Sequence, residues 1–445
     1  MDKPGRKNRS LRALALCLAA LAAAHVFPAG AEASDAVGGI LISSPSVAVS
    51  GEYRRKYASD LFSSAFRGDP DSMYRLGIMY RDGAGLPRNS ENAIELLKRS
   101  AGRGNDSAAS ALGLLYLDRS AAAPDYDAAV AVLRGAAGRG SSDAQYILWT
   151  LYKQGLAVRK DQAIALQYLR QSAADHNPQA EFDLAYCYET GYCGINRDLI
   201  TARRLYRNAA DAGIAGAAYR VSLMMENGEG GKTDPAGAFR YMKKAADAGA
   251  GTAEHRMGLY YLSGIQTPKS PEKAAAMFTE SAAKGSADAM LALGDLYLDG
   301  TGVIRNPGMA ASLFVQAAKF DKEAAGTRLA GLYASGTGVR KSRRNVRFWL
   351  EFSARRGNAG ASYLAGKMYA TGDGGERDYI KARYFLKKAA DSGIREARAL
   401  LGYLYSEGKG GERNMGIACS LLETAIDPRL PDVNQKYEDI CVSGR

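Results

Sequence analysis

Residues 287–302 read ADAMLALGDLYLDGTG and residues 323–338 read EAAGTRLAGLYASGTG, so an alanine, a tyrosine and a Gly-x-Gly pair recur 36 residues apart. Tyrosine returns along most of the chain, with Met225 in its place once, after the single 37-residue step: Tyr80, Tyr116, Tyr152, Tyr188, Tyr261, Tyr297, Tyr333, Tyr369 and Tyr405. Alanine stands eight residues before nine of these ten positions, and Ser72 before the first. A fixed period of this length indicates a repeat array.

Each repeat has the pattern of a helical hairpin. The tyrosine and the positions four and eight residues before it lie about one helical turn apart, so they define one packed face of a first helix. A glycine-rich loop follows, and a second helix ends at another glycine, which suits the left-handed backbone beyond a helix end. The sequence therefore predicts an all-α fold, an α/α superhelical solenoid of about ten 36-residue helix-turn-helix repeats.

A small residue recurs three positions before the tyrosine, inside the first helix. In six repeats it is glycine, which costs about 1 kcal/mol relative to alanine within a helix: Gly77, Gly113, Gly258, Gly294, Gly366 and Gly402. Close approach of a second helix would offset this cost. We therefore expect helix-to-helix contact at these glycines.

The order of alanine, Leu-Gly, tyrosine and Gly-x-Gly, as in Ala289 through Gly302, resembles the Sel-one-like repeat, a relative of the tetratricopeptide repeat. The resemblance covers residues 53–427 and implies a scaffold, adaptor or regulator, since such solenoids carry many functions. Departures are concentrated in repeats two to four, where we expect irregular packing: Asp118-Arg119-Ser120, Trp149, Ala157-Val158 and His176.

Residues 1–33 have the three parts of a secretory signal. Basic residues up to Arg12 precede an apolar run, and the small residues Ala31 and Ala33 offer cleavage sites. We expect cleavage near one of these alanines and a periplasmic or secreted protein. The apolar run is too short to span a bilayer, so no transmembrane segment is expected in the mature chain.

The two ends of the mature chain differ from the repeats. Residues 34–52 are small, serine-rich and without helical period, which predicts a flexible leader. Residues 428–445 follow the last repeat, and Pro428 and Pro431 interrupt helix there. Because terminal repeats need a cover, we expect these residues to fold back as a capping tail.

The charge of the chain is moderately basic. It contains 59 Lys and Arg against 47 Asp and Glu; residues 1–33 hold five and two of these, which leaves 54 against 45, a net charge of +9. Such an excess favours anionic partners such as acidic polysaccharide or phospholipid headgroups. Nucleic acid is not an expected partner, because no nucleic-acid-binding module is recognisable.

Four cysteines follow the signal, and an even number favours disulfides in an oxidising compartment. Proximity in sequence suggests Cys187–Cys193 and Cys419–Cys441 among three connectivities. Cys187 also occupies a column otherwise filled by methionine and leucine, so a buried free thiol remains an alternative.

No catalytic, cofactor or metal site is expected. His176 and His255 lie far apart in the sequence, and no nucleophile stands near either in a recognisable pattern. Gly231-Lys232-Thr233 departs from a phosphate-binding loop, which requires glycine at the position of Glu226 and a preceding strand.

The resemblance to tetratricopeptide arrays implies an inner face formed by the first helices. Its predicted partner-binding residues are largely aromatic, suited to peptide segments or sugar rings: Tyr74, Tyr146, Phe182, Tyr186, Tyr219, His255, Tyr363 and Tyr403. The alternative is that they pack between repeats. A separate basic cluster is either a solvated face or an anion-binding patch: Arg340, Lys341, Arg343, Arg344 and Arg347.

The resulting hypothesis is a non-enzymatic periplasmic or secreted adaptor for envelope proteins or peptide segments. Analogy with alginate-type systems suggests a scaffold in exopolysaccharide synthesis and export, with anionic polysaccharide as a further ligand. One alternative is a periplasmic regulator that binds and represses a sensor kinase. Another is a cell-wall hydrolase with an unrecognised site.

Overall fold

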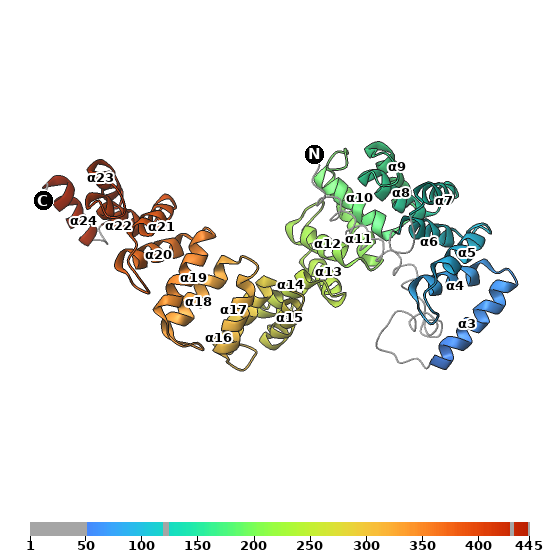
Figure 1. Ribbon diagram of the computed structural model, residues 1–445, viewed down its shortest axis with the longest axis horizontal. Coiled ribbons are helices and arrows are strands. Elements are labelled where there is room, and N and C mark those ends of the chain that lie inside the picture. The colour runs from blue at the N-terminus through green and yellow to red at the C-terminus, as the bar shows by residue number, and fades with distance from the viewer. Residues whose placement is uncertain (1–50, 119–123, 428–430, 444–445) are drawn as a thin grey trace. The chain divides into compact units, whose positions relative to one another are not determined.

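The computed structural model describes residues 51–118, 124–427 and 431–443. In these ranges the chain forms 22 α-helices and one short π-helical segment, and no strand (Figure 1). The helices come in repeated pairs that stack as a solenoid, as the sequence predicts. The predicted signal in residues 1–33, its cleavage sites at Ala31 and Ala33, and residues 34–50 of the predicted leader lie outside the described residues.

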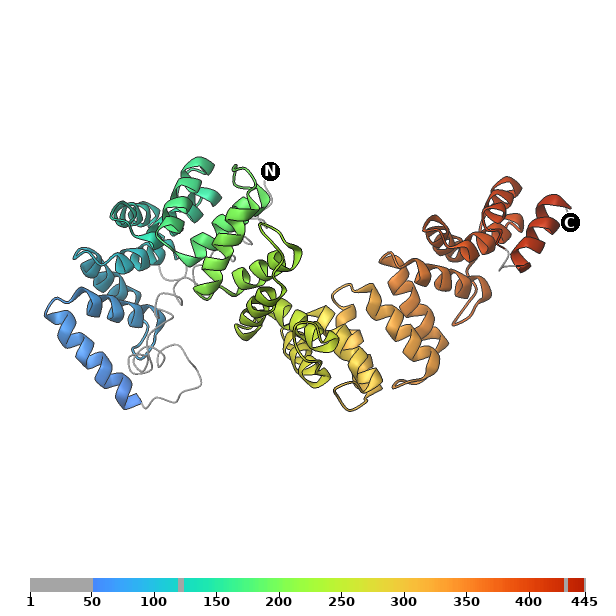
Figure 2. The ribbon, with the colours of Figure 1, turned by 180° about the vertical axis from the view of Figure 1, so that it is seen from behind.

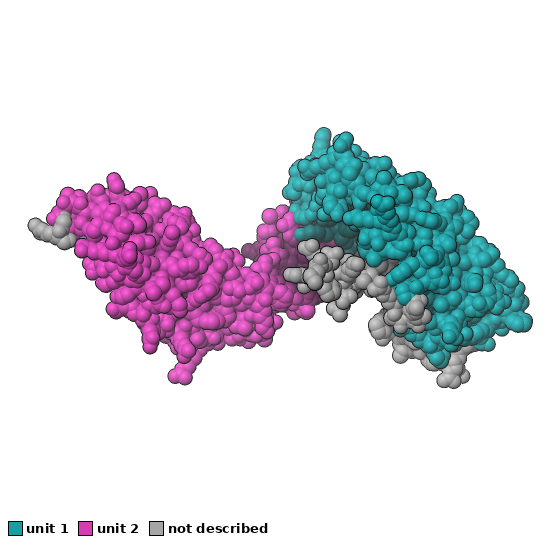
Figure 3. Space-filling model, turned by 45° about the horizontal axis from the view of Figure 1, so that its top comes forward, with its two compact units in different colours: residues 1–241 teal, residues 242–445 magenta. Residues whose placement is uncertain are grey.

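The chain divides into two compact units, residues 1–241 and 242–445, with the boundary inside α13 (Figure 3). Within unit 1 the described helices are α3 (Gly51–Phe66), α4 (Pro70–Asp82), α5 (Ser90–Ala101), α6 (Asp106–Leu117), α7 (Tyr126–Gly138), α8 (Ser142–Gln154), α9 (Gln162–Ala174), α10 (Pro178–Thr190), α11 (Leu199–Asp211), α12 (Ala215–Asn227) and the start of α13 (Pro235–Asp247).

Unit 2 continues from α13 with five further pairs and a short tail (Figure 2). Its helices are α14 (Gly251–Ser263), α15 (Pro271–Ala283), α16 (Ala287–Asp299), α17 (Pro307–Ala318), α18 (Glu323–Ser335), α19 (Arg343–Arg355), α20 (Ala359–Thr371), α21 (Tyr379–Asp391), α22 (Arg395–Ser406), α23 (Met415–Glu423), α24 (Pro431–Tyr437) and the π-helical η1 (Glu438–Val442).

The glycines inside the first helices make room for a large side chain of the second helix, as expected. A Cβ atom on Gly77 would lie 2.8 Å from Leu97 Cγ, and one on Gly366 would lie 2.7 Å from Leu386 Cγ. In α14 and α16 the partners are the fully buried rings of Phe278 and Phe314. The partner always stands 20 residues after the glycine: Leu97, Leu133, Phe278, Phe314, Leu386 and Leu422.

A capping residue that the sequence reading did not single out closes every hairpin. Its backbone N–H donates to the carbonyl of the repeated tyrosine position, as Asn89 does to Tyr80 at 2.9 Å and Asn414 to Tyr405 at 3.0 Å. Its side chain also accepts a backbone N–H from the first turn of the second helix, which satisfies an otherwise unpaired donor. The column contains only Asp, Asn and Ser: Asn89, Asp125, Asp161, Asp198, Asp234, Ser270, Asn306, Ser342, Asp378 and Asn414.

Of the departures in repeats two to four, Asp118 changes the backbone, because it ends α6 in an extended conformation where most first helices end at a left-handed glycine, whereas Ala157 and His176 keep the backbone of the other repeats. Ala157 and His176 stand where other repeats have glycine, and they adopt the same left-handed backbone, with φ of 60° and 57°. Gln266 and Asp321 do likewise at the equivalent positions of later repeats. Trp149 is buried at the position of the helix glycine. Arg119 and Ser120 lie outside the described residues.

Both cysteine pairs suggested by the sequence are bonded in the structure. Cys187 and Cys193 have Cα atoms 5.2 Å apart, so Cys187 is buried in the methionine and leucine column and also bonded. Cys419 and Cys441 have Cα atoms 5.6 Å apart and join α23 to η1. Next to this bond the tail packs on the last repeat, with Val433, Tyr437, Ile440 and Cys441 against Ala399, Leu422 and Ala425.

Loss of the second bond is expected to loosen the tail and leave the repeats intact. The Cys419→Ser/Cys441→Ser variant removes a constraint worth about 2–4 kcal/mol, because the reduced tail has more conformations available. Hydrogen exchange should accelerate in α24 and η1 and remain unchanged in α14 to α21. The Cys187→Ser/Cys193→Ser variant is the control and should leave exchange in the tail at its parent rate. Equal protection of the tail in all three proteins would contradict this prediction.

Candidate partner-binding face

The first helices of unit 1 line the inner side of a curve. The helices of this unit follow an arc, with α4, α6 and α8 on its inner side and α5, α7 and α9 on its outer side (Figure 1). Successive first helices also contact one another directly, α4 with α6 and α6 with α8. A solvent-facing stripe on these helices therefore faces the hollow of the arc.

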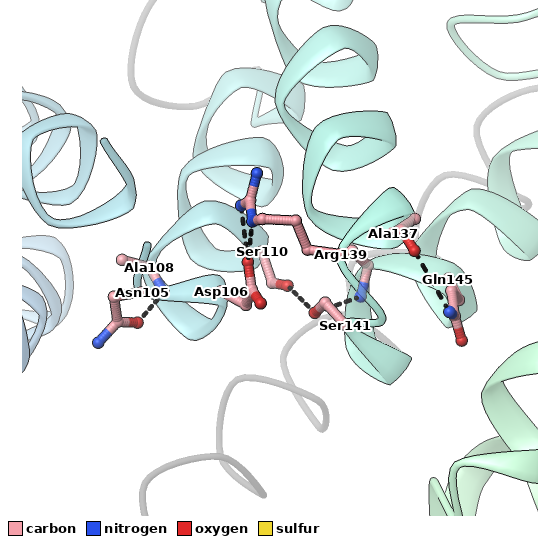
Figure 4. Close-up of polar contacts among 9 residues, drawn as sticks. Asn105, Asp106, Ala108, Ser110, Ala137, Arg139, Ser141 and Gln145 are labelled. Carbon is pink, nitrogen blue, oxygen red and sulfur yellow. Dashed lines mark hydrogen bonds and ion pairs between the residues drawn. The ribbon is translucent and has the colours of Figure 1, made fainter. Parts of the chain in front are cut away.

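In the first three repeats, polar side chains join neighbouring helices along this stripe. Ser110 Oγ of α6 lies 3.5 Å from Ser141 Oγ at the start of α8, and the Arg139 guanidinium reaches back to Asp106 (Figure 4). Burial raises the pKa of Tyr74, and the charge of Asp143, two repeats further on, acts in the same direction. The small residues of α6 allow this close approach.

Tyr146 belongs to the packed part of the molecule. Only 4% of it is exposed, and its ring centroid lies 5.2 Å from that of Trp149. Lys153 Nζ lies 4.3 Å from the centroid of the Trp149 ring. The Tyr146 hydroxyl donates to Asp183 Oδ2 at 2.7 Å and so links α8 to α10. Burial raises the pKa of Asp183, against the opposing effects of the Tyr146 hydroxyl and the Lys153 charge.

The stripe opens at α10 and α12. Tyr186 is 47% exposed, and Phe182 and Tyr219 beside it are half-buried. Tyr192, in the loop after α10, is 68% exposed. The Cys187–Cys193 bond anchors that loop, and the Tyr192 N–H donates to Thr190 Oγ1 at 3.2 Å. The sequence reading missed Tyr192, although its place between two cysteines marks it as part of a fixed loop.

A charged pair lies beside these aromatic residues. Glu189 on α10 accepts a hydrogen bond of 2.7 Å from the Tyr206 hydroxyl and pairs with Arg220 on α12. Burial raises the pKa of Tyr206, which therefore stays a donor. We define the open face as Phe182, Tyr186, Tyr192, Tyr219 and the Glu189–Arg220 pair. It offers aromatic contact surface together with hydrogen-bonding groups.

The remaining predicted aromatic residues lie in unit 2 and on separate helices. His255 on α14 is half-buried, with its ring 5.5 Å from that of Phe278, and burial lowers its pKa. Tyr363 on α20 is half-buried, and burial raises its pKa. Tyr403 on α22 lies under two lysines, Lys409 and Lys436, whose Nζ atoms are 5.0 and 5.1 Å from the ring centroid.

The predicted basic cluster separates into two parts. Arg347 donates from Nη1 to the Glu376 carbonyl at 2.9 Å and covers the Tyr369 ring, so it fastens α19 to the next repeat. Arg343 pairs with Asp373 at 3.6 Å. Arg340, Lys341 and Arg344 remain exposed.

The same fastening recurs wherever a loop reads Gly-x-Gly-Gly. Arg203 donates to the Lys232 carbonyl at 2.9 Å and Arg383 to the Glu412 carbonyl at 3.3 Å. The last glycine of each loop leaves space for the guanidinium: Gly231, Gly375 and Gly411. The glycines of these loops, including the one before Lys232, therefore have a packing role.

Within the described ranges, no group of three or more His, Cys, Asp or Glu side chains is arranged to hold a metal ion. No helix in the part of the chain that the structure describes combines the length and apolar character needed to cross a bilayer.

The comparisons with known proteins agree with this architecture. The Sel1 repeat model matches nine segments: 70–105, 142–177, 178–214, 215–249, 251–286, 287–319, 325–358, 359–394 and 395–427. The crystal structure of c5321, a protective antigen present in uropathogenic Escherichia coli strains and displaying an SLR fold, has 26% sequence identity and a TM-score of 0.73 and covers 87% of this chain and 83% of its own.

A Sel1 repeat protein from Oxalobacter formigenes is also similar, with 28% identity, a TM-score of 0.53 and coverage of 70% of this chain and 90% of its own. No curated protein shows significant similarity to the chain. Because the repeat model matches well over half of the residues, in the register of the helix pairs, the chain belongs to the Sel1 repeat family.

Proposed function

We propose that this protein is a non-enzymatic adaptor of the periplasm or the extracellular space that captures a protein segment on the open face of α10 and α12. The Sel1 repeat fold is typical of scaffolds for protein–protein interaction. The observation that carries the proposal is the exposure of Tyr186 and Tyr192 beside the half-buried Phe182 and Tyr219.

The chemistry of this face suits a peptide segment. Tyrosine and phenylalanine supply a large contact area at a low cost in side-chain entropy, and the hydroxyl groups bind polar atoms at the same time. The Glu189–Arg220 pair adds an acceptor and a donor at fixed positions. The disulfide-anchored loop holds Tyr192 in place before a partner arrives, which lowers the entropy lost on binding.

Two observations support an extracytoplasmic location. Residues 1–33 carry the basic, apolar and small-residue segments of a secretory signal. The similar Escherichia coli protein is a protective antigen. Within the envelope we propose a machine for exopolysaccharide synthesis and export as the setting, on the analogy with alginate-type systems.

The test begins by identifying the partner from the open face itself. A photo-crosslinkable amino acid replaces Tyr186 in one full chain and Phe320 in another, and both are expressed in the native host. Phe320 is a matched control, because it is an aromatic residue of similar exposure, 54%, directly after α17. We expect a protein cross-linked from position 186 and absent from position 320.

Affinity for that purified protein is then measured. The Tyr186→Ala/Tyr192→Ala variant should bind at least about 30-fold more weakly, as for hot-spot aromatic residues. Its thermal unfolding should match that of the parent, since both side chains are largely exposed. The Phe320→Ala variant should bind like the parent. Unchanged affinity of the double variant would overturn the proposal.

A further inference from the structure

The positive charge of the chain is concentrated near one end of the repeat array. Residues 340–413 contain 17 Lys and Arg against 8 Asp and Glu, a net charge of +9. This equals the net charge of the whole chain after residue 33, which is 54 − 45 = +9. The rest of that chain is therefore neutral overall, and repeats eight to ten carry the excess.

Two second helices in this region present apolar and basic side chains together. On α19, Arg344, Phe348 and Arg355 are spaced by four and seven residues, so they share one side of the helix, and Phe348 is 59% exposed. On α21, Ile380, Tyr384 and Lys387 share the equivalent side. Ile380 is 72% exposed and Tyr384 is 50% exposed. We name these six residues the basic–aromatic face.

The two halves of this face are neighbours. The Arg347 guanidinium of α19 and Lys381 Nζ of α21 both lie over the Tyr369 ring, 4.7 and 5.1 Å from its centroid. Arg355 binds Glu351 by a hydrogen bond and an ion pair and also interacts electrostatically with Tyr384. The side chains of α19 and α21 therefore form one continuous surface.

Several basic side chains of this surface are not neutralised by an acidic side chain. Among the described residues, Arg344 and Lys387 form no ion pair with an acidic side chain. Lys388 lies over the Tyr384 ring at 4.9 Å, without a carboxylate partner in the same ranges. Of the acidic side chains nearby, Glu351 is held by Arg355 and the Tyr369 hydroxyl, Asp378 pairs with Lys381, and Asp391 is exposed.

We propose that the basic–aromatic face binds the surface of an anionic lipid membrane. Exposed arginine and lysine side chains are attracted to negatively charged headgroups. Phe348 and Ile380 enter the boundary between headgroups and acyl chains, as apolar residues of interfacial helices do. These six residues lie on other helices than the open face of α10 and α12, so the proposed lipid-binding residues and the proposed partner-binding residues are distinct.

The apolar side chains favour lipid over an acidic polysaccharide. A sugar ring stacks on an aromatic face, but it gains little from a branched aliphatic side chain such as Ile380 and leaves that side chain in water. A bilayer accepts both Ile380 and Phe348. An acidic sugar chain would use the charges and the aromatic rings but would leave Ile380 in water.

The test measures sedimentation of the full chain with lipid vesicles. Vesicles of phosphatidylglycerol and phosphatidylcholine in equal amounts are compared with vesicles of phosphatidylcholine alone. We expect binding to the anionic vesicles only, weakened by high salt because ions screen the charges. The Arg344→Glu/Lys387→Glu variant should bind at least about tenfold more weakly. The Phe348→Ser/Ile380→Ser variant should also lose binding, although its charge is unchanged.

The matched control reverses two exposed arginines on the second helix α11 of unit 1, in the Arg204→Glu/Arg207→Glu variant. It changes the net charge by the same amount and should bind vesicles like the parent. Circular dichroism melting confirms that each variant is folded. Equal loss in the control, full binding by Phe348→Ser/Ile380→Ser, absence of vesicle binding by the parent, or preference for a soluble polyuronate over vesicles would each overturn the proposal.

Discussion

The Phe314→Ala variant is expected to lose about 3–5 kcal/mol of stability in the helices around α17, the usual cost of removing a large buried aromatic side chain. Phe314 is fully buried, and its ring occupies the space left by Gly294 on α16. In a repeat array each repeat contacts mainly its neighbours, so the loss should be local. Hydrogen exchange should accelerate most in α16, α17 and α18 and least in the helices of unit 1.

The complementary change tests the same contact from the other side. A Cβ atom on Gly294 would overlap the Phe314 ring, so Gly294→Ala should cost about 1–3 kcal/mol, as overpacked cores do. In the Phe314→Ala background the clash is gone, and the cost of Gly294→Ala should largely disappear. Such non-additivity is the signature of direct contact.

Gly331 provides the control for this pair of variants. It also lies inside a first helix, α18, but nothing stands within 4 Å of a Cβ atom built on it. Gly331→Ala should therefore be neutral or stabilise by up to about 1 kcal/mol, the helix propensity of alanine over glycine. A loss of stability at Gly331 similar to that at Gly294 would contradict the packing explanation.

The sequence predicts this contact only in part. A glycine column inside helices indicates close approach, because nothing else offsets its cost. It does not identify the side chain that approaches, since both Leu and Phe occur at that position. The Asp, Asn and Ser column that closes each hairpin is equally regular, and it could have been predicted from helix-capping preferences.

The inner face was harder to predict, because the curvature of the array decides which residues are exposed. Tyr146 and Tyr186 both occupy predicted inner-face positions, yet one is 4% exposed and the other 47%. The two residues stand at different positions of the first helix, Tyr146 six residues before its repeated tyrosine and Tyr186 two residues before its own, and Tyr146 also packs on Trp149 and bonds to Asp183 of the next first helix. A single repeat contains no information about the packing of its neighbours.

Tyr146→Ala is accordingly expected to destabilise repeats three and four by about 3–5 kcal/mol, as for other buried aromatic residues. The variant loses the ring contact with Trp149 and the hydrogen bond to Asp183. Tyr186→Ala removes the same kind of side chain from an exposed site and should cost less than about 1 kcal/mol. Thermal melts of the two variants measure the difference, and equal losses would contradict the burial of Tyr146.

Tyr146→Phe keeps the ring and removes only the hydroxyl. Its effect on the free energy of unfolding should depend on pH. Burial raises the pKa of Asp183 in the folded protein, so the folded state binds this proton more tightly than the unfolded state does. The stability that the bound proton contributes is lost as the pH rises through the folded-state pKa. The Tyr146 hydroxyl stabilises the carboxylate, and its removal raises that pKa further. At neutral pH we expect a loss of about 1–2 kcal/mol, reduced for partial exposure of the pair.

The loss should shrink as the pH falls through the folded-state pKa of Asp183, which lies above its ordinary value, because the protonated carboxyl no longer presents a charged acceptor to the hydroxyl. Urea unfolding of Tyr146→Phe and the parent at a series of pH values measures this difference. Tyr186→Phe is the control, because its hydroxyl lies on the exposed stripe, and its effect should be small and independent of pH. A constant difference between Tyr146→Phe and the parent at every pH would mean that the hydroxyl does not stabilise the Asp183 carboxylate, and the link between α8 and α10 would then depend on the ring alone.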